Sequence, residues 1–369
     1  MALLVRRCTR RQLLVTGFAA ALGAEGQKGT EYASDWRRYS DPSTELVVYR
    51  LTDPAFSSRL PLYYNRMIAR HNAFLLFACD RNGSPQAFRM DLKSGATIQL
   101  TDARALDSTS LNLLPDSHAF ACFDGPTLRL ITLQNLHERE FYTVPDEWER
   151  GAGVSVSADG GSVLFPERRG GSSRLRSVHL GRGAARTVVE APFEIQHPIP
   201  RPIRGQVLYR DGDRALWLVN GDGSQQRQLR LAAGRIGPAN WSADGRLVLY
   251  LRFPEDPTQL NEIREYTPDT NTDRLVAKTS QFVHFGFNRD TSVFVGASRN
   301  AASPTVLLLL RITRREFTLC EHKASTPAMV QPIFAPDAQR VYFESDRHGK
   351  PAIYCIPVER LVEKIDSES

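Results

Sequence analysis

Seven apolar landmarks recur along the chain at a nearly constant spacing. Each lies at or near the end of a short apolar run, and successive landmarks are 46, 42, 44, 41, 45 and 48 residues apart. The landmarks are Phe77, Phe123, Phe165, Tyr209, Tyr250, Val295 and Phe343. A repeat of about 44 residues with several short β-type runs and almost no helical periodicity is typical of a β-propeller, whose blades are four-stranded antiparallel sheets. The chain is therefore predicted to be all-β, a seven-bladed β-propeller.

Most repeats begin with a turn rich in Asp, Asn or Gly, such as "SADGG" at 157–161 and "SADGR" at 242–246. Turns of this composition separate short strands. The first and last repeats are the most alike, reading "FLLFACDRNGSPQAFRM" at 74–90 and "RVYFESDRHGKPAIYCI" at 340–356. These two stretches are predicted to be equivalent strands of neighbouring blades in a closed ring.

The segment "ELVVYRLTD" at 45–53 resembles "GATIQLTD" at 95–102, the final strand of the first repeat, although it precedes every repeat. The last repeat, in contrast, ends in a polar tail after "AIYCIPV". We therefore expect residues 45–52 to form the outer strand of the seventh blade, so that an N-terminal strand closes the ring and removes an exposed edge. The predicted propeller spans residues 25–360, followed by a polar C-terminal tail at 361–369.

Residues 1–24 have the features of a signal peptide of the twin-arginine type. Arg10 and Arg11 precede an apolar stretch at 13–22, and small residues follow at Ala21, Gly23 and Ala24. The apolar stretch is too short for an ordinary transmembrane helix. The sequence thus predicts a protein that is exported to the periplasm or beyond, without membrane attachment after cleavage of the signal.

Composition excludes some classes of protein. With 41% apolar and 24% charged residues, the chain is globular. Its formal net charge of +6 falls to +2 without residues 1–24, which hold four arginines and no acid, so nucleic-acid binding is not expected. The cysteines that remain lie in or beside β-type runs and are expected to be buried free thiols. They are Cys79, Cys122, Cys320 and Cys355.

The repeats alone resemble those of TolB-type propellers, but several segments between them resemble the oligogalacturonate lyases. The most distinctive are "QHPIPRPI" at 196–203 and "LWLVNGDGS" at 216–224, and "FVHFGFN" at 282–288 and "HGKPAIY" at 348–354 add to them. Lyases of this family are seven-bladed propellers that cleave short pectin fragments by β-elimination. The resemblance covers nearly the whole chain after the signal and implies an oligogalacturonide or another uronate sugar as the ligand.

Such an elimination needs a base near C5 of the galacturonate and positive charge on the neighbouring carboxylate. The resemblance implies that a divalent metal such as manganese and an arginine supply this charge. In the family, one His and a "Q-x-x-H-x-H-P" segment hold the metal, and the base is the His of "H-E-F-W".

This chain departs from that pattern. "GPANW" at 237–241 stands in place of "H-E-F-W", which puts Pro238 at the position of the base. In "TPAMVQPIFAPD" at 326–337, Thr326, Met329 and Gln331 stand at the positions of the Gln and the two His ligands. The metal ligands predicted from the resemblance are therefore His284 and Gln331. With so few ligands, manganese is expected to bind weakly or not at all.

The resemblance also implies residues that contact the sugar. Arg201, between two prolines, matches the family's substrate-facing arginine and is predicted to bind a uronate carboxylate and to take part in catalysis; a surface salt bridge is the alternative. His197 matches a family histidine that either orients this loop or takes part in catalysis. Arg59 is a further candidate for carboxylate binding. The other six histidines are expected to be solvated; they are His71, His118, His137, His179, His322 and His348.

Two functions remain open on the sequence. One is an exported relative of the lyases that acts on or binds oligogalacturonides with a degraded base and metal site. The other is a non-catalytic TolB-like propeller that binds a carbohydrate, or a protein partner on one face. No serine-hydrolase, Walker or dinucleotide-binding motif is present. The metal content of protein purified with manganese present is the measurement that best distinguishes these two functions.

Overall fold

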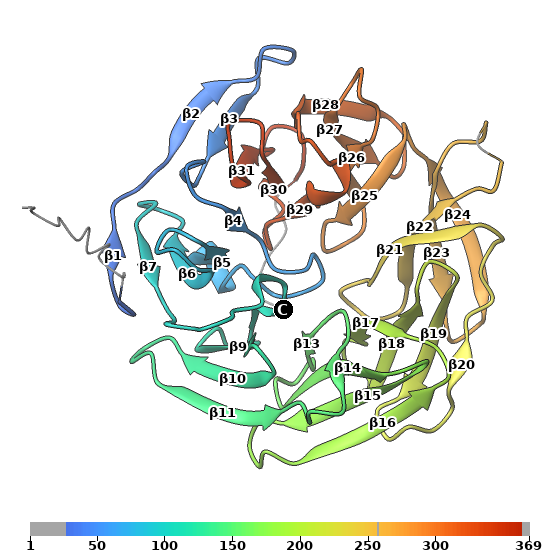
Figure 1. Cartoon of the computed structure of the whole chain (residues 1–369). Coiled ribbons are helices and arrows are strands. Elements are labelled where there is room, and N and C mark those ends of the chain that lie inside the picture. Colours follow the sequence, from blue (N-terminus) through green and yellow to red (C-terminus); the bar gives the residue numbers. More distant parts are fainter. Residues whose placement is uncertain (1–26, 257, 364–369) are drawn as a thin grey trace, which may run out of the picture.

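The computed structural model describes residues 27–256 and 258–363. These residues form seven antiparallel sheets arranged as blades of a ring (Figure 1), which confirms the predicted all-β, seven-bladed propeller. The predicted signal peptide and the tail from residue 364 onward lie outside the described residues. Within the described ranges, no helix has the length and apolar character needed to cross a membrane.

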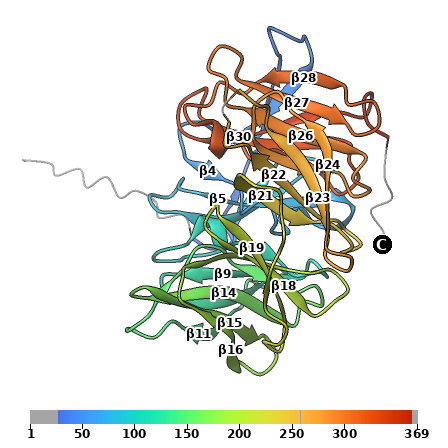
Figure 2. The same ribbon diagram turned by 90° about the vertical axis from the view of Figure 1, so that its right-hand side faces the viewer.

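Each blade begins with a strand at the ring centre and ends with one at the rim (Figure 1). Figure 2 shows the same ring turned by 90°. Blade 1 contains β4 (Ser58–Arg59), β5 (Phe74–Cys79), β6 (Gln86–Asp91) and β7 (Thr97–Gln99). Blade 2 contains β8 (Asn112–Leu113), β9 (Ala119–Asp124), β10 (Thr127–Thr132) and β11 (Glu138–Thr143). Blade 3 contains β13 (Ser155–Val156), β14 (Ser162–Arg169), β15 (Ser172–His179) and β16 (Ala185–Ala191), with β12 (Glu149–Arg150) also paired to β14.

The remaining four blades complete the ring. Blade 4 contains β17 (Ile195–Pro200), β18 (Gln206–Asp211), β19 (Ala215–Asn220) and β20 (Arg227–Gln228). Blade 5 contains β21 (Arg235–Trp241), β22 (Val248–Phe253), β23 (Glu262–Thr267) and β24 (Thr272–Lys278), and blade 6 contains β25 (Phe282–Phe287), β26 (Val293–Ser298), β27 (Thr305–Leu310) and β28 (Glu316–Glu321). Blade 7 contains β29 (Ile333–Phe334), β30 (Arg340–Ser345) and β31 (Ala352–Pro357). Three short 3₁₀ helices lie between strands: η1 (Arg70–Asn72), η2 (Ser108–Ser110) and η3 (Pro327–Met329).

The core of the protein lies between adjacent blades. All seven landmarks of the repeat fall in the second strand of a blade, and each is at most 2% exposed. Phe123 of blade 2 and Phe165 of blade 3, for example, pack edge to face with their ring centroids 5.0 Å apart. The spacing that defines the repeat is therefore the spacing of one buried strand per blade.

The N-terminal segment closes the ring, as predicted. β3 (Val47–Arg50) pairs with β31 of blade 7, and the Cα atoms of Tyr49 and Cys355 face each other. β3 is not the outermost strand, however, because β2 (Arg37–Ser40) pairs along its far side. In addition, β1 (Glu31–Tyr32) pairs with β7 at the rim of blade 1. The N-terminal segment thus holds both blades that meet at the seam.

Burial confirms one expectation about single residues and corrects another. The four cysteines named above are buried and free. His322, in contrast to the solvated position that the sequence predicts, has a fully buried side chain. Its Nε2 lies 2.9 Å from the carbonyl oxygen of Ser298 in blade 6, and its own carbonyl accepts a bond from Ser345 in blade 7. The connection from β28 to η3 therefore packs between blades 6 and 7. The polar sequence around His322 does not indicate this burial.

The two faces of the ring differ in the chain segments that form them. On the start face, the chain enters the first strand of each blade; on the turn face, it turns from the first strand to the second. The Asp-rich turns found in the sequence lie on the turn face, where Asp159, for example, accepts hydrogen bonds from the Ser157 hydroxyl and the Gly161 amide.

Candidate functional site

The inner strand of blade 1 is interrupted by a loop that enters the ring centre. After β4, residues 60–66 leave the sheet, and the chain rejoins it where the carbonyl of Met67 accepts a bond from the Leu76 amide. We call residues 60–66 the central loop. At its two ends it is fixed to neighbouring elements: Leu60 N donates to a carboxylate oxygen of Glu344, and the carbonyl of Arg66 accepts from Leu113 N.

Two tyrosines of the central loop connect blade 1 to the far side of the ring. The hydroxyl of Tyr63 donates to the carbonyl of Ala239 at 2.9 Å and accepts from its amide at 3.0 Å, in blade 5. The hydroxyl of Tyr64 lies 3.0 Å from Nδ1 of His197, in blade 4. The ring of Tyr63 also meets that of His284, in blade 6, edge to face at 4.7 Å. Four blades therefore meet at these two side chains.

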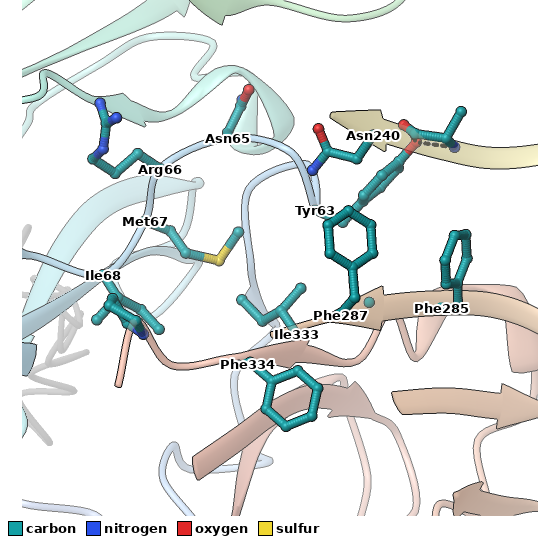
Figure 3. Close-up of a pocket in the computed structure, with 13 residues that line it drawn as sticks. Tyr63, Asn65, Arg66, Met67, Ile68, Asn240, Phe285, Phe287, Ile333 and Phe334 are labelled. Carbon is teal, nitrogen blue, oxygen red and sulfur yellow. Dashed lines mark hydrogen bonds between the residues drawn. The ribbon is translucent and has the colours of Figure 1, made fainter. Parts of the chain in front are cut away.

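Tyr63 also borders a cavity of about 190 Å³ at the ring centre (Figure 3). Its wall is largely apolar and includes Met67, Phe285, Phe287 and Phe334. Among the residues that line it, Arg66 carries the charge. The cavity offers apolar contact area beside the tyrosine pair but no acidic group.

The inner strands of blades 4, 5 and 6 each carry a β-bulge near their start. The register shifts fall between Gln196 and Ile199 in β17, between Ile236 and Ala239 in β21, and between Phe282 and His284 in β25. Bulges re-aim side chains and are frequent beside active sites. They lie at His197, at Pro238 and at His284, three positions to which the lyase resemblance assigns a role.

Arg210 lies beside these bulges. In β18 its Cα faces that of Gln196, the neighbour of His197. The guanidinium donates through Nε to the carbonyl of Gly212 at 3.0 Å, through Nη1 to that of Gly237 at 2.9 Å and through Nη2 to that of Ile236 at 2.5 Å. It forms no ion pair with a carboxylate of the described residues. We call Tyr63, Tyr64, His197, Arg210 and His284 the central cluster.

Burial controls the protonation of the central cluster. Together with a smaller effect of the nearby Arg210 guanidinium, it lowers the pKa of His197 to about 4 and that of His284 to about 3. Burial raises the pKa of Tyr63 and Tyr64, against which Arg210 acts in the opposite direction. Near neutral pH the imidazoles and phenols are therefore uncharged, and Arg210 carries the charge of the cluster.

The predicted metal ligands meet the requirements of a divalent cation poorly. His284 alone has a feature expected of a metal ligand. It is 6% exposed, and its buried Nδ1 has no hydrogen-bond partner. The other positions offer the amide of Gln331, the thioether of Met329 and an exposed Thr326. No group of three or more His, Cys, Asp or Glu side chains that could hold a metal occurs in the described part of the chain. The ligand roles of His284 and Gln331 remain predictions.

His197, Arg59 and Gln331 lie in or just before the first strands of blades 4, 1 and 7, toward the start face. His197 has a left-handed backbone with φ of 48°. A Cβ on Gly153 would approach its Cα to 2.6 Å and the Tyr64 hydroxyl to 2.7 Å, so this close contact requires glycine. Arg59 pairs through Nη1 with Glu344 at 2.9 Å, across the seam between blades 1 and 7. Burial raises the pKa of Glu344 to about 7 although Arg59 and the Leu60 amide lower it.

Arg201 lies apart from the other candidates, at the end of β17 on the turn face. It lines a hollow of about 1020 Å³ there, but its side chain is 2% exposed. Its Nε donates to the carbonyl of Gly245, and its terminal nitrogens contact both oxygens of Asp269 at 3.1 and 3.2 Å. The guanidinium also covers the ring of Trp241. These contacts favour the salt-bridge alternative; binding of a uronate by Arg201 remains an untested prediction.

Sequence reasoning missed Tyr63, Tyr64 and Arg210. The tyrosines stand in "SRLPLYY", the segment in which Arg59 is the predicted ligand-binding residue. Arg210 directly follows the landmark Tyr209, and Glu344 likewise follows Phe343. A charged residue directly after a buried landmark was the available signal.

Comparison with known proteins supports the lyase resemblance. A family model described as oligogalacturonate lyase matches residues 26–165. The oligogalacturonide lyase of Pectobacterium atrosepticum is 24% identical, and the oligogalacturonate lyase of Dickeya dadantii is 23% identical; each alignment covers 90% of this chain and 98% of the relative. An oligogalacturonate lyase structure in complex with manganese superposes with a TM-score of 0.85 at 24% identity, covering 89% of this chain and 98% of that one. The oligogalacturonate lyase of Vibrio parahaemolyticus has the same TM-score and identity, with 90% and 99% covered.

Proposed function

Because this chain is similar to oligogalacturonate lyases over about 90% of its length, we propose that it is a member of their family and binds short galacturonate oligosaccharides at the start face of the propeller. The observation that carries the proposal is convergence. Three bulged inner strands and the central loop bring His197, His284, Tyr63 and Tyr64 to one place beside the cationic Arg210. Neutral hydrogen-bonding side chains, aromatic rings and one cation are the groups that an acidic sugar needs.

We propose further that β-elimination by this site is weak or absent. The position of the family's base is Pro238, which has no side chain able to accept a proton. His197 is the nearest alternative, but its lowered pKa makes the imidazole a weak base, and Tyr64 already contacts its Nδ1. Loss of a general base typically costs about 10²–10⁴-fold in rate.

Calorimetric titration with trigalacturonate, compared with the uncharged galactotriose, tests the binding proposal. Saturable binding of the acidic sugar alone is expected, together with little ultraviolet absorbance from unsaturated product over the same period. Equal binding of both sugars, or of neither, contradicts the proposal; the latter result favours a non-catalytic TolB-like propeller with a protein partner. Robust metal-dependent turnover contradicts the view that the catalytic site is degraded.

We also propose that the protein is exported through the twin-arginine route and is cleaved near residues 21–24. The proposal rests on Arg10 and Arg11 ahead of a short apolar stretch. Replacing both arginines by lysine should leave the protein in the cytoplasm. Unchanged export of this double variant, measured by cell fractionation, would argue against the route.

A further inference from the structure

The central cluster contains a cation that has no anionic partner among the described residues. Resting on the proposed uronate function, we propose that the Arg210 guanidinium binds the sugar carboxylate directly, so that this chain recognises its ligand without a divalent metal. The proposal concerns a residue to which the lyase resemblance assigns no role. It explains how a site that lacks most of its metal ligands can still recognise an acidic sugar.

The first argument is the charge of Arg210. Its three hydrogen bonds go to the backbone carbonyls of Gly212, Ile236 and Gly237, which orient the guanidinium but do not neutralise it. Among the described residues, no carboxylate oxygen lies within 4.0 Å of a nitrogen of the Arg210 guanidinium. A half-buried charge in this state is poorly compensated, and a carboxylate ligand improves its environment.

The second argument is that Arg210 retains donor capacity. A guanidinium has five N–H groups, and the three carbonyl bonds use one on each nitrogen. One N–H on each terminal nitrogen is not engaged by these carbonyls, and the Tyr63 hydroxyl is the one further acceptor among the described residues that interacts with the guanidinium. Paired N–H donors of this kind match the two oxygens of a carboxylate.

The third argument concerns Asp107, an acid close enough to act on Tyr64 of the cluster. It already forms an ion pair with Arg150, so it does not compete for Arg210 in this structure. In addition, Nδ1 of His284 is buried without a partner. The cluster thus combines the cation of blade 4 with an unused polar atom of blade 6.

The same arrangement disfavours a divalent cation. A metal held by His284 would lie near Arg210, because the Tyr63 ring packs on His284 at 4.7 Å and its hydroxyl bonds to Ala239, two residues from the Gly237 carbonyl that Arg210 binds. Like charges repel strongly where solvent is excluded. The described residues provide no acidic cluster to offset that repulsion. Arg210 and a metal at this place are therefore alternatives.

The test compares trigalacturonate binding in manganese and in excess EDTA, by calorimetry, for the unaltered protein and three variants. We expect the unaltered affinity to agree within about twofold between the two conditions. Arg210→Gln should weaken binding at least about 30-fold, as expected for loss of one member of a desolvated charge pair. Arg210→Lys should give an intermediate loss, because it keeps the charge but not the paired donors. Arg214→Gln removes an exposed arginine of the same blade and should bind as the unaltered protein does.

Two outcomes overturn the inference while leaving the proposed function intact: binding that requires manganese, or binding that Arg210→Gln leaves unchanged. Absence of binding under every condition instead overturns the proposed function. If Arg210→Gln fails to fold, a measurement on the unaltered protein still decides. Titration with manganese alone, followed by the electron paramagnetic resonance of the free ion, should show no binding at micromolar metal; stoichiometric uptake contradicts the inference.

Discussion

The hydroxyl of Tyr64 in blade 1 lies 3.0 Å from Nδ1 of His197 in blade 4, so one hydrogen bond joins residues 133 positions apart across the ring centre. Gly153 permits this contact, since a side chain there would occupy the same space. Tyr64 is thus part of the support of the candidate site. Through the bulge at His197 it also fixes the strand next to Arg210.

Replacing Tyr64 by Phe should therefore destabilise the protein without removing a charge. The change leaves Nδ1 of a largely buried His197 without its partner, which typically costs about 1–3 kcal/mol. Urea unfolding of the two proteins measures the difference. Tyr49→Phe is a suitable control, because the Tyr49 hydroxyl forms no hydrogen bond with another described residue; an equal loss in both variants would refute the role given to Tyr64.

Glu344 should make stability depend on pH. Because burial raises its folded-state pKa to about 7 from 4.5, its contribution is fully present below about pH 4.5 and is lost as the pH rises through 7. The loss is at most about 3 kcal/mol. Glu344→Gln should remove this slope, so the variant gains relative stability between pH 5 and 8 in urea unfolding. A slope that is the same in both proteins would exclude Glu344 as its source.

The N-terminal strands should be essential to the ring. A chain that begins at residue 55 lacks β1, β2 and β3 and exposes the edge of β31. It should lose several kcal/mol of stability or aggregate. A chain that lacks only residues 27–33 loses the short β1 pairing and should be affected less. An unchanged melting temperature after the longer deletion would contradict the closure.

Restoring the family's ligand pattern should change metal binding. Replacing Pro238, Met329 and Gln331 by His and Thr326 by Gln is expected to raise manganese affinity at least about tenfold, since even ligand-supporting residues alter metal affinity by about 10–100-fold. Lyase activity, followed by ultraviolet absorbance, should rise if the imidazole introduced by Pro238→His also serves as the base. Unchanged metal affinity in a folded variant would show that these positions do not surround a metal.

The sequence predicted the fold well because the fold depends on local, repeated patterns. Each landmark, from Phe77 to Phe343, marks a strand buried between two blades, and its spacing reflects one blade. Closure by residues 45–52 was also predictable, since that segment has the pattern of a final strand but no blade of its own. The pairing of β1 with blade 1 was not predictable, because its two residues are too few to show a strand pattern.

The candidate site was less predictable because it depends on distant contacts. Arg201 had the appearance of a ligand-binding arginine between two prolines, but its partner Asp269 lies 68 residues away and its side chain is buried. Arg210 lies in a strand and shows its role only when the carbonyls of Ile236 and Gly237, in the next blade, are placed beside it. Periodicity does not encode such relationships.

Pairing of β3 with β31 also has a consequence for the timing of biosynthesis. Tyr49 meets Cys355 only after about 300 further residues have been made, which at ~5–20 residues per second takes ~15–60 s. During that interval six blades can assemble one after another, while the first-made strands wait for a partner. The nascent chain must be protected from edge-to-edge association for this period, so the last step of folding, rather than the first, determines the yield of folded protein.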